Sequence, residues 1–314
     1  MKRIVLSGTD IETSSLGFGC SALMGSGSRA YRQRLLSQAL ELGVTHFDVA
    51  RYYGLGEAES ELGRFLKANP GKATVATKFG INPLPFATAG FSRLFSRLGA
   101  QSFGKQIERT AGERTHRFKL AEARAALETS LRKLKVDTID VYLLHDCRSK
   151  DVRNPDLLNF LMKSKADGKI RSFGVASEIE SILEIDQTIP AYTNVIQLEN
   201  SLLRPNLKRI PSLPNRAVIT HRALSHNLVK LLELITQHSK QAEAWSDELG
   251  VDLKDPLVLA NAMLAYAAAE NPNGITLFST TKIRRIKSNV CAIQHPILPP
   301  QKLQRLMELL VAFK

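Results

Sequence analysis

Eight short apolar segments alternate with helix-forming segments along the chain, and this alternation limits the folds that 314 residues can adopt. Strands that are separated by helices form parallel βαβ units, and right-handed crossovers that return to the first strand close a barrel. We therefore predict an α/β fold of the (β/α)8 barrel type. The eight segments are SLGFGCSAL, THFDVA, TVATKF, IDVYLLHD, IRSFGVAS, NVIQLENS, AVITHRAL and GITLFSTT.

Both ends of the chain carry additional elements. Residues 3–13 are typical of a short β-hairpin that turns at Ser-Gly-Thr-Asp. The apolar stripe from Leu303 to Val311 follows helical spacing and predicts a C-terminal helix. A barrel of this size commonly forms one domain, so we expect residues 1–314 to make a single domain with an irregular basic insertion at about 81–118.

The composition favours a cytoplasmic protein with a large core. The chain is 44% hydrophobic, but none of its apolar runs approaches the roughly 18 residues of a membrane span. The N-terminal MKRIVLSG lacks the apolar region of a secretory signal. The three cysteines are odd in number and lack metal-ligand spacing, which suits a reducing compartment and predicts neither disulfides nor a metal site.

Polar residues interrupt the apolar segments mainly where each predicted strand ends. In (β/α)8 barrels the chemistry lies at the C-terminal ends of the strands. We therefore expect these side chains to meet in one active site. The residues are Asp48, Lys78, His145, Ser177, Gln197, His221 and Ser279.

Four residues predict proton transfer to a carbonyl group. Tyr53 lies five residues past Asp48, far enough to lean back over the end of that strand. A phenol has a pKa of about 10, and an ammonium group such as that of Lys78 would favour its ionised form. Asp48 would keep Lys78 charged and in place, and His145 would orient the carbonyl oxygen. Tyr53 would then protonate an alkoxide as a hydride arrives at carbon.

The motifs FDVARYYG, ATKFG, DVYLLHD, GKIRSFGVAS, VIQLEN and STTKIRRIKSN occur in an order and spacing that resemble the aldo-keto reductase family. This resemblance implies a (β/α)8 oxidoreductase that uses a nicotinamide cofactor. It implies that Asp48, Tyr53, Lys78 and His145 form the catalytic tetrad. It assigns cofactor binding to Ser177, Gln197, His221, Ser279, Thr280, Lys282, Arg285 and Asn289.

The chain departs from the family pattern at several positions. Glu178 stands where the family usually has Asn, and His221 stands where it usually has a Tyr that stacks on the nicotinamide. Arg222 follows His221 in place of a Ser, and the usual loop over the pyrophosphate is replaced by a helix-like run from Leu228. We still expect NADP as the cofactor, because Lys282 and Arg285 would attract a 2′-phosphate at the start of a helix.

The net charge of +13 is concentrated in two stretches, which argues against a general nucleic-acid surface. Residues 91–119 hold seven basic and two acidic residues, and residues 279–314 hold seven basic and one acidic residue. The insertion at about 81–118, which contains most of the first stretch, leaves the strand that carries Lys78. We therefore expect the small carbonyl or alcohol substrate to carry anionic groups, which these basic side chains would attract.

Two other functions remain open from the residues alone. The altered cofactor positions are compatible with a cofactor-binding regulatory subunit that turns over little substrate. Lys78 is also compatible with Schiff-base lyase chemistry, although an adjacent Asp48 would raise the lysine pKa that such chemistry needs to be low.

Overall fold

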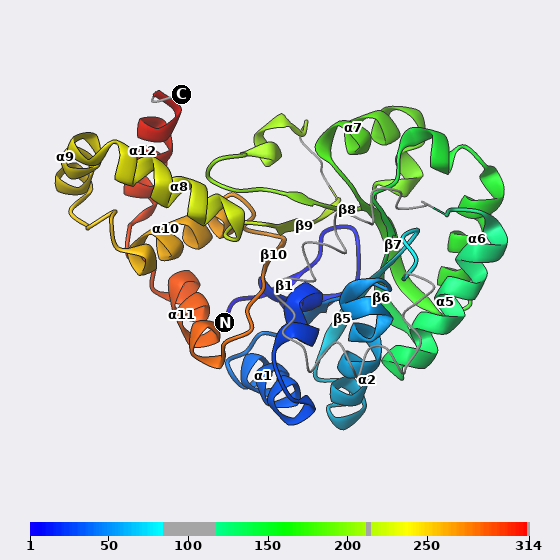
Figure 1. The fold of residues 1–314 in the computed structure, drawn as a ribbon. Coiled ribbons are helices and arrows are strands. Elements are labelled where there is room, and N and C mark those ends of the chain that lie inside the picture. Colours follow the sequence, from blue (N-terminus) through cyan, green and yellow to red (C-terminus); the bar gives the residue numbers. More distant parts are fainter. Residues whose placement is uncertain (84–116, 212–214, 313–314) are drawn as a thin grey trace.

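Eight parallel strands close into a barrel in the computed structural model, which describes residues 1–83, 117–211 and 215–312 (Figure 1). The order around the barrel follows the order in the chain, and the last strand pairs with the first. The predicted (β/α)8 barrel is therefore confirmed. Its strands are β3 Leu16–Gly19, β4 His46–Asp48, β5 Thr74–Phe79, β6 Ile139–His145, β7 Ile170–Ala176, β8 Val195–Glu199, β9 Ala217–His221 and β10 Ile275–Phe278.

α-Helices cover the outside of the barrel between most consecutive strands, whereas the described residues between β8 and β9 hold only the 3-10 helix Asn206–Arg209 (Figure 1). Several begin at expected signals: Ser28 accepts a hydrogen bond from the Tyr31 amide, and Asn154 caps a helix whose first residue is Pro155. The helices are α1 Arg29–Glu41, α2 Ala58–Ala68, α5 Leu120–Leu134, α6 Pro155–Ala166, α7 Ile179–Thr188, α8 His226–Gln237, α9 Ser239–Leu249, α10 Pro256–Ala269, α11 Ile283–Gln294 and α12 Pro300–Ala312.

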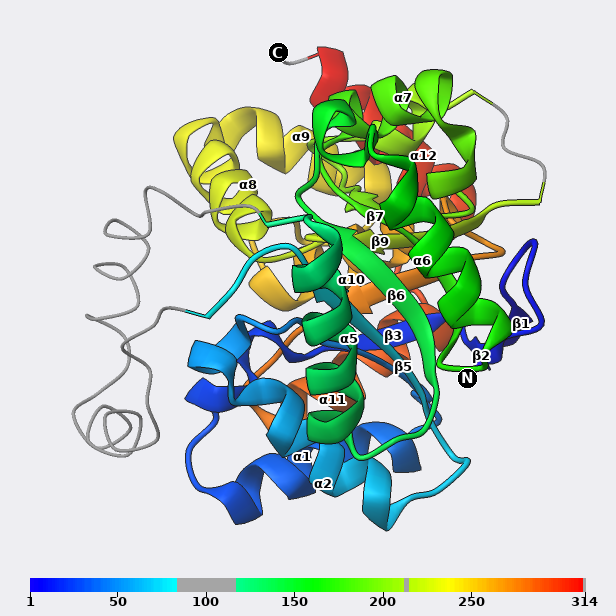
Figure 2. The same cartoon turned by 90° about the vertical axis from the view of Figure 1, so that its right-hand side faces the viewer.

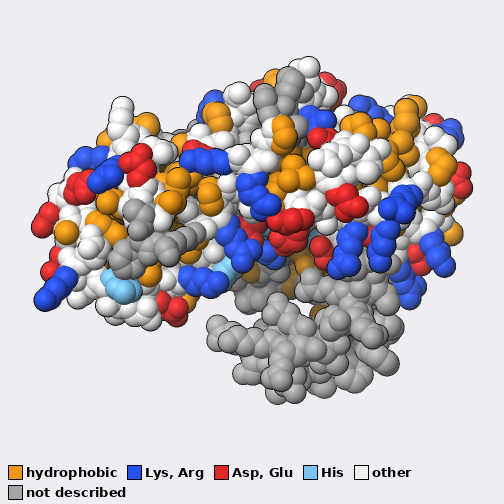
Figure 3. All heavy atoms as spheres, turned by 90° about the horizontal axis from the view of Figure 1, so that it is seen from above, with side chains coloured by type: hydrophobic (Ala, Val, Ile, Leu, Met, Phe, Trp, Pro, Cys, Tyr) orange, Lys and Arg blue, Asp and Glu red, His pale blue; other side chains and the backbone are white. Residues whose placement is uncertain are grey.

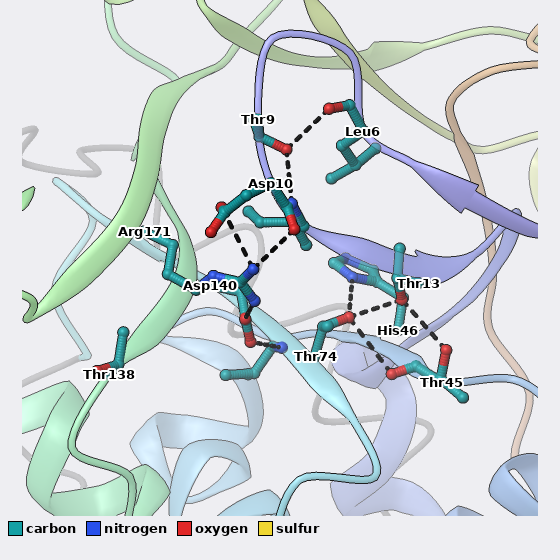
Figure 4. A network of polar contacts seen from close by, with 12 residues as sticks. Leu6, Thr9, Asp10, Thr13, Thr45, His46, Thr74, Thr138, Asp140 and Arg171 are labelled. Atoms are coloured by element: carbon teal, nitrogen blue, oxygen red, sulfur yellow. Dashed lines mark hydrogen bonds and ion pairs between the residues drawn. The ribbon is translucent and has the colours of Figure 1, made fainter.

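The predicted hairpin, β1 Arg3–Val5 and β2 Glu12–Ser14, closes the N-terminal end of the barrel (Figure 2). Thr13 Oγ1 lies 2.7 Å from Oγ1 of Thr74, the first residue of β5, and His46 Nδ1 lies 3.0 Å from the same oxygen (Figure 4). Arg171 donates to the Asp10 carbonyl and to Asp140 Oδ1, at 2.9 and 2.7 Å. The opposite, C-terminal end of the strands remains available for a site.

The first predicted strand is shorter than expected. It ends at Gly19, and a 3-10 helix covers Cys20–Gly25. The apolar run continues past the strand because Cys20 and Leu23, three residues apart, are both buried on one side of that helix.

A second apolar cluster is formed mainly by side chains of α8, α9, α10 and α12. Figure 1 shows these helices grouped on one side of the barrel. Helix α9 was not predicted, because its sequence SKQAEAWSDEL is mostly polar. Only Ala242, Trp245 and Leu249 of this helix are buried. Among the described residues no helix has the length and apolar character to cross a membrane.

Charged side chains of the described residues are spread over the face of the molecule that Figure 3 shows. There, acidic and basic side chains of the described residues are interspersed. Residues 84–116, which hold most of the predicted insertion, lie outside the described residues.

Candidate active site

A cavity of about 390 Å³ opens at the C-terminal end of the barrel. All seven strand-end residues singled out in the sequence line it, and so does Tyr53. The sequence therefore located these side chains correctly, because parallel strands bring their C-terminal ends to one edge. The eight are Asp48, Tyr53, Lys78, His145, Ser177, Gln197, His221 and Ser279.

Asp48 and Lys78 form a buried ion pair at the base of this cavity. Lys78 Nζ donates to both carboxylate oxygens of Asp48, at 2.6 and 2.8 Å, and to the Val49 carbonyl at 3.1 Å. Both residues are 3% exposed. Their strands β4 and β5 are neighbours, so the pairing follows directly from the sheet. A buried charge is costly without a partner, and here each group supplies the charge that the other needs.

Gln197 donates a third hydrogen bond to the Asp48 carboxylate. Its Nε2 donates to Asp48 Oδ2 at 2.8 Å, and Gln197 is 1% exposed. The family resemblance assigned Gln197 only to the cofactor, so the contact with Asp48 was not predicted. No local signal could have shown it, because the two residues are 149 positions apart.

A short 3-10 turn, Tyr53–Gly56, holds Tyr53 above the ion pair. Gly54 in this turn has φ of 58°, and a Cβ there would lie 2.1 Å from Met24 Cγ. The turn therefore requires glycine for both conformation and space. The Tyr53 ring centroid lies 5.3 Å from Lys78 Nζ and 6.1 Å from the His145 ring centroid.

Lys78 does not activate Tyr53 in the way the sequence suggested. Its ammonium faces the Tyr53 ring, while its hydrogen bonds go to Asp48 and to Val49. Burial and then the charge of Asp48 raise the pKa of Tyr53 well above 10, and Arg222 opposes this rise. Tyr53 is therefore protonated at neutral pH.

The side of the cavity formed by β7 and β9 carries neutral polar groups. Ser177 Oγ donates to the Cys147 carbonyl at 3.0 Å. Burial, together with the charges of Arg222 and Lys78, lowers the pKa of His221 to about 3. The imidazole is neutral in the physiological range, so it can lie against a cationic ring without charge repulsion.

Arg222 forms ion pairs with two glutamates, and these pairings were not predicted from the sequence. Its Nη1 lies 3.2 Å from Oε2 of Glu199, which is 3% exposed, and 3.8 Å from Oε1 of Glu178. Arg222 has φ of 59°, and Asn227 Nδ2 holds its carbonyl at 2.9 Å. Two of the departures from the family pattern, Glu178 and Arg222, therefore lie next to each other at the mouth of the cavity.

The remaining candidate cofactor residues lie in the turn after β10 and on α11. Ser279 Oγ donates to the Gly19 carbonyl at 2.8 Å, and Thr280 Oγ1 accepts from the Lys282 amide at 3.1 Å. Arg285 and Asn289 are one helical turn apart on α11 and share a face. The first turn of this fully described helix holds no acidic residue, so it presents positive charge at a helix N-terminus.

A family model for the aldo/keto reductase family matches residues 15–311. The chain belongs to the aldo/keto reductase family. A probable aldo-keto reductase from Glycine max is 24% identical over 93% of this chain and 84% of its own length. An NADH-specific methylglyoxal reductase from Escherichia coli (strain K12) is 28% identical over 56% of this chain and 52% of its own length. An aldo-keto reductase from Bacillus halodurans, solved in its holo form, has 22% identity and a TM-score of 0.69 over 98% of this chain and 96% of its own.

The cavity of this aldo/keto reductase suits a nicotinamide cofactor. The neutral His221 can contact a ring that is positive when oxidised, and Ser177 and Gln197 can exchange hydrogen bonds with a carboxamide. The basic, acid-free start of α11 suits phosphate groups. Members of the family use nicotinamide cofactors, and the residues present are compatible with one.

Proposed function

We propose that this chain reduces carbonyl substrates with NADPH and that Tyr53 is the general acid. One observation carries the proposal. The buried Asp48–Lys78 pair, Tyr53 and His145 converge on one cavity together with the residues suited to the nicotinamide. Ser177, Gln197 and His221 would hold the nicotinamide, and Ser279, Thr280, Lys282, Arg285 and Asn289 would hold the rest of the cofactor.

The bound cofactor supplies the hydride, and the protein supplies the proton. The Tyr53 hydroxyl donates its proton to the carbonyl oxygen as negative charge develops there. His145 orients that oxygen, and the tight Asp48–Lys78 pair keeps the Lys78 ammonium in place against the Tyr53 ring.

The raised pKa of Tyr53 favours the direction of reduction. A phenol whose pKa lies well above 10 is protonated throughout the neutral range and can act as an acid there. Alcohol oxidation would need the phenolate instead, so its rate should rise with pH over a range in which the rate of carbonyl reduction stays constant.

Consumption of NADPH over a panel of aldehydes, ketones and sugars tests the proposed function. Binding without turnover on every carbonyl would favour the regulatory-subunit alternative.

The geometry of Lys78 argues against Schiff-base chemistry. An amine must lose its proton to attack a carbonyl, but Lys78 Nζ lies 2.6 and 2.8 Å from the two oxygens of Asp48. A partner of opposite charge at this distance stabilises the ammonium. Borohydride with a carbonyl substrate should therefore leave Lys78 unmodified.

We expect a preference for NADPH over NADH that depends on Arg285. An arginine suits a 2′-phosphate, and losing a hydrogen bond to a charged group costs about tenfold or more in affinity. Arg285→Gln should therefore weaken NADPH binding about tenfold and leave NADH binding nearly unchanged in fluorescence titrations. Lys287→Gln is the matched control, because it removes an exposed cation from a different face of α11. Equal loss in both variants, or tighter binding of NADH by the wild type, would contradict the assignment.

We further propose an anionic substrate, on the basis of the charges in residues 91–119. If these charges attract the substrate, replacing Arg109 and Arg114 by Gln should lower kcat/KM, and added salt should reduce the difference, because salt screens over about 8 Å. Arg117→Gln is the control, since Arg117 already lies 3.6 Å from Glu122. A double variant that matches the wild type at every ionic strength would exclude this role.

A further inference from the structure

The hydrogen bond between Gln197 and Asp48 connects opposite sides of the barrel. In the closed order of eight strands, β4 and β8 lie four positions apart in either direction. Gln197 Nε2 nevertheless reaches Asp48 Oδ2 at 2.8 Å, across the base of the cavity that both residues line. The contact is buried, with Gln197 1% and Asp48 3% exposed. It therefore joins the nicotinamide side of the cavity to the catalytic ion pair.

The chemistry of the two groups fixes the orientation of the Gln197 amide. A carboxylate only accepts hydrogen bonds, so Gln197 must turn its NH2 group toward Asp48. Asp48 already accepts twice from Lys78, and the amide supplies a further neutral donor to Oδ2. Of the side-chain hydrogen-bonding groups of Gln197, one N–H and the oxygen Oε1 remain for other partners.

We propose that Gln197 is a positioning residue. Its hydrogen bond to Asp48 fixes which edge of the Gln197 amide faces the nicotinamide carboxamide. The same amide stabilises the Asp48 carboxylate, which holds Lys78 beside Tyr53. Cofactor binding and the catalytic pair are therefore coupled through one side chain. The part of this proposal that concerns the carboxamide rests on the proposed function, whereas the link between Gln197 and Asp48 does not.

The variant Gln197→Glu tests the link in the protein without cofactor. It would place two carboxyl groups at hydrogen-bond distance, and such a pair retains a proton because both cannot ionise together. At about pH 5 the two carboxyl groups share one proton, which makes the hydrogen bond to Asp48 that the Gln197 N–H makes in the wild type. The pKa of the pair in the folded state is raised above the unfolded value of about 4.3, so stability is lost as pH rises through the raised value.

We expect the melting temperature of Gln197→Glu, relative to the wild type, to be about 5 °C lower at pH 8 than at pH 5. Gln197→Met removes the donor without adding a charge. Its melting temperature should therefore lie below that of the wild type by an amount that does not change with pH. In Asp48→Asn/Gln197→Glu the pH-dependent part should disappear, because the side-chain amide introduced in place of the Asp48 carboxylate would then donate to the new carboxylate. The link between Gln197 and Asp48 is refuted if the melting temperatures of Gln197→Glu and Gln197→Met depend on pH in the same way. It is also refuted if the melting temperature of Asp48→Asn/Gln197→Glu shows the same pH dependence as that of Gln197→Glu.

Binding and turnover test the consequence for the cofactor. Gln197→Met should weaken NADPH binding in fluorescence titrations and also lower kcat at saturating NADPH by about tenfold, the scale of one lost hydrogen bond. Ser177→Ala should weaken binding with a much smaller effect on kcat, because Ser177 contacts Cys147 and not the ion pair. A Gln197→Met protein that binds NADPH weakly but keeps the wild-type kcat would overturn the coupling. A wild type with no turnover at all would refute the proposed function, while the melting experiment still decides the link.

Discussion

Replacing Tyr53 by Phe should lower kcat for carbonyl reduction by about 10²-fold or more, the scale of a lost general acid. The ring remains, so its contacts with His145 and with the Lys78 ammonium remain as well. NADPH affinity should change little, because the hydroxyl acts on the carbonyl oxygen of the substrate. Pre-steady-state measurement of NADPH oxidation isolates the chemical step from product release.

Tyr52→Phe provides a matched control for this prediction. Tyr52 lies next to Tyr53 in sequence, also lines the cavity, and has its ring centroid 5.2 Å from that of His145. It should lose far less activity than Tyr53→Phe. The assignment of Tyr53 is wrong if Tyr53→Phe keeps more than about a tenth of wild-type turnover where chemistry limits the rate.

Replacing Lys78 by Met should destabilise the protein by about 3–5 kcal/mol at neutral pH, because it leaves the buried Asp48 charge without its cation. The pKa of Asp48 in the folded variant would rise above the unfolded value of about 3.9. Stability is then present below the unfolded value and is lost as pH rises through the folded value. The deficit in the free energy of unfolding should therefore shrink as pH falls toward about 4, as measured by urea denaturation.

Asp48→Asn/Lys78→Met serves as the control for charge. It removes both members of the pair, so no buried charge remains, and much of the lost stability should return. Turnover should not return, because the effects of residues that act as a unit are not additive. A Lys78→Met deficit that is independent of pH, or a double variant that is less stable than Lys78→Met, would show that the pair does not contribute through its charge.

The fold was predictable because its apolar segments are short, regular and separated by clear helix signals. The segment TVATKF corresponds to β5 residue for residue, and the helix from Pro155 ends just before Gly168 as expected. The helix α9 was missed because it buries few apolar side chains, including Trp245, against neighbours distant in sequence. Its stability comes from tertiary packing, which a local pattern does not contain.

The candidate site was predictable to the level of strand ends, but not to the level of contacts. Asp48 and Lys78 pair between neighbouring strands, so their interaction could be expected. The bonds from Gln197 to Asp48 and from Arg222 to Glu199 depend on the width of the barrel and on a loop with positive φ. The direction of the Tyr53 pKa also depended on burial and on the charge of Asp48, and neither effect can be read from spacing.

Transfer of deuterium from the cofactor to a carbonyl carbon tests the central claim most directly. NADPH labelled at the transferable position of the nicotinamide would be mixed with the wild type, with Tyr53→Phe and with a reactive aldehyde. The account predicts an alcohol that carries one deuterium on the former carbonyl carbon, formed by the wild type and strongly reduced with Tyr53→Phe. An alcohol without deuterium, or no alcohol from any member of the carbonyl panel although NADPH binds, would contradict it.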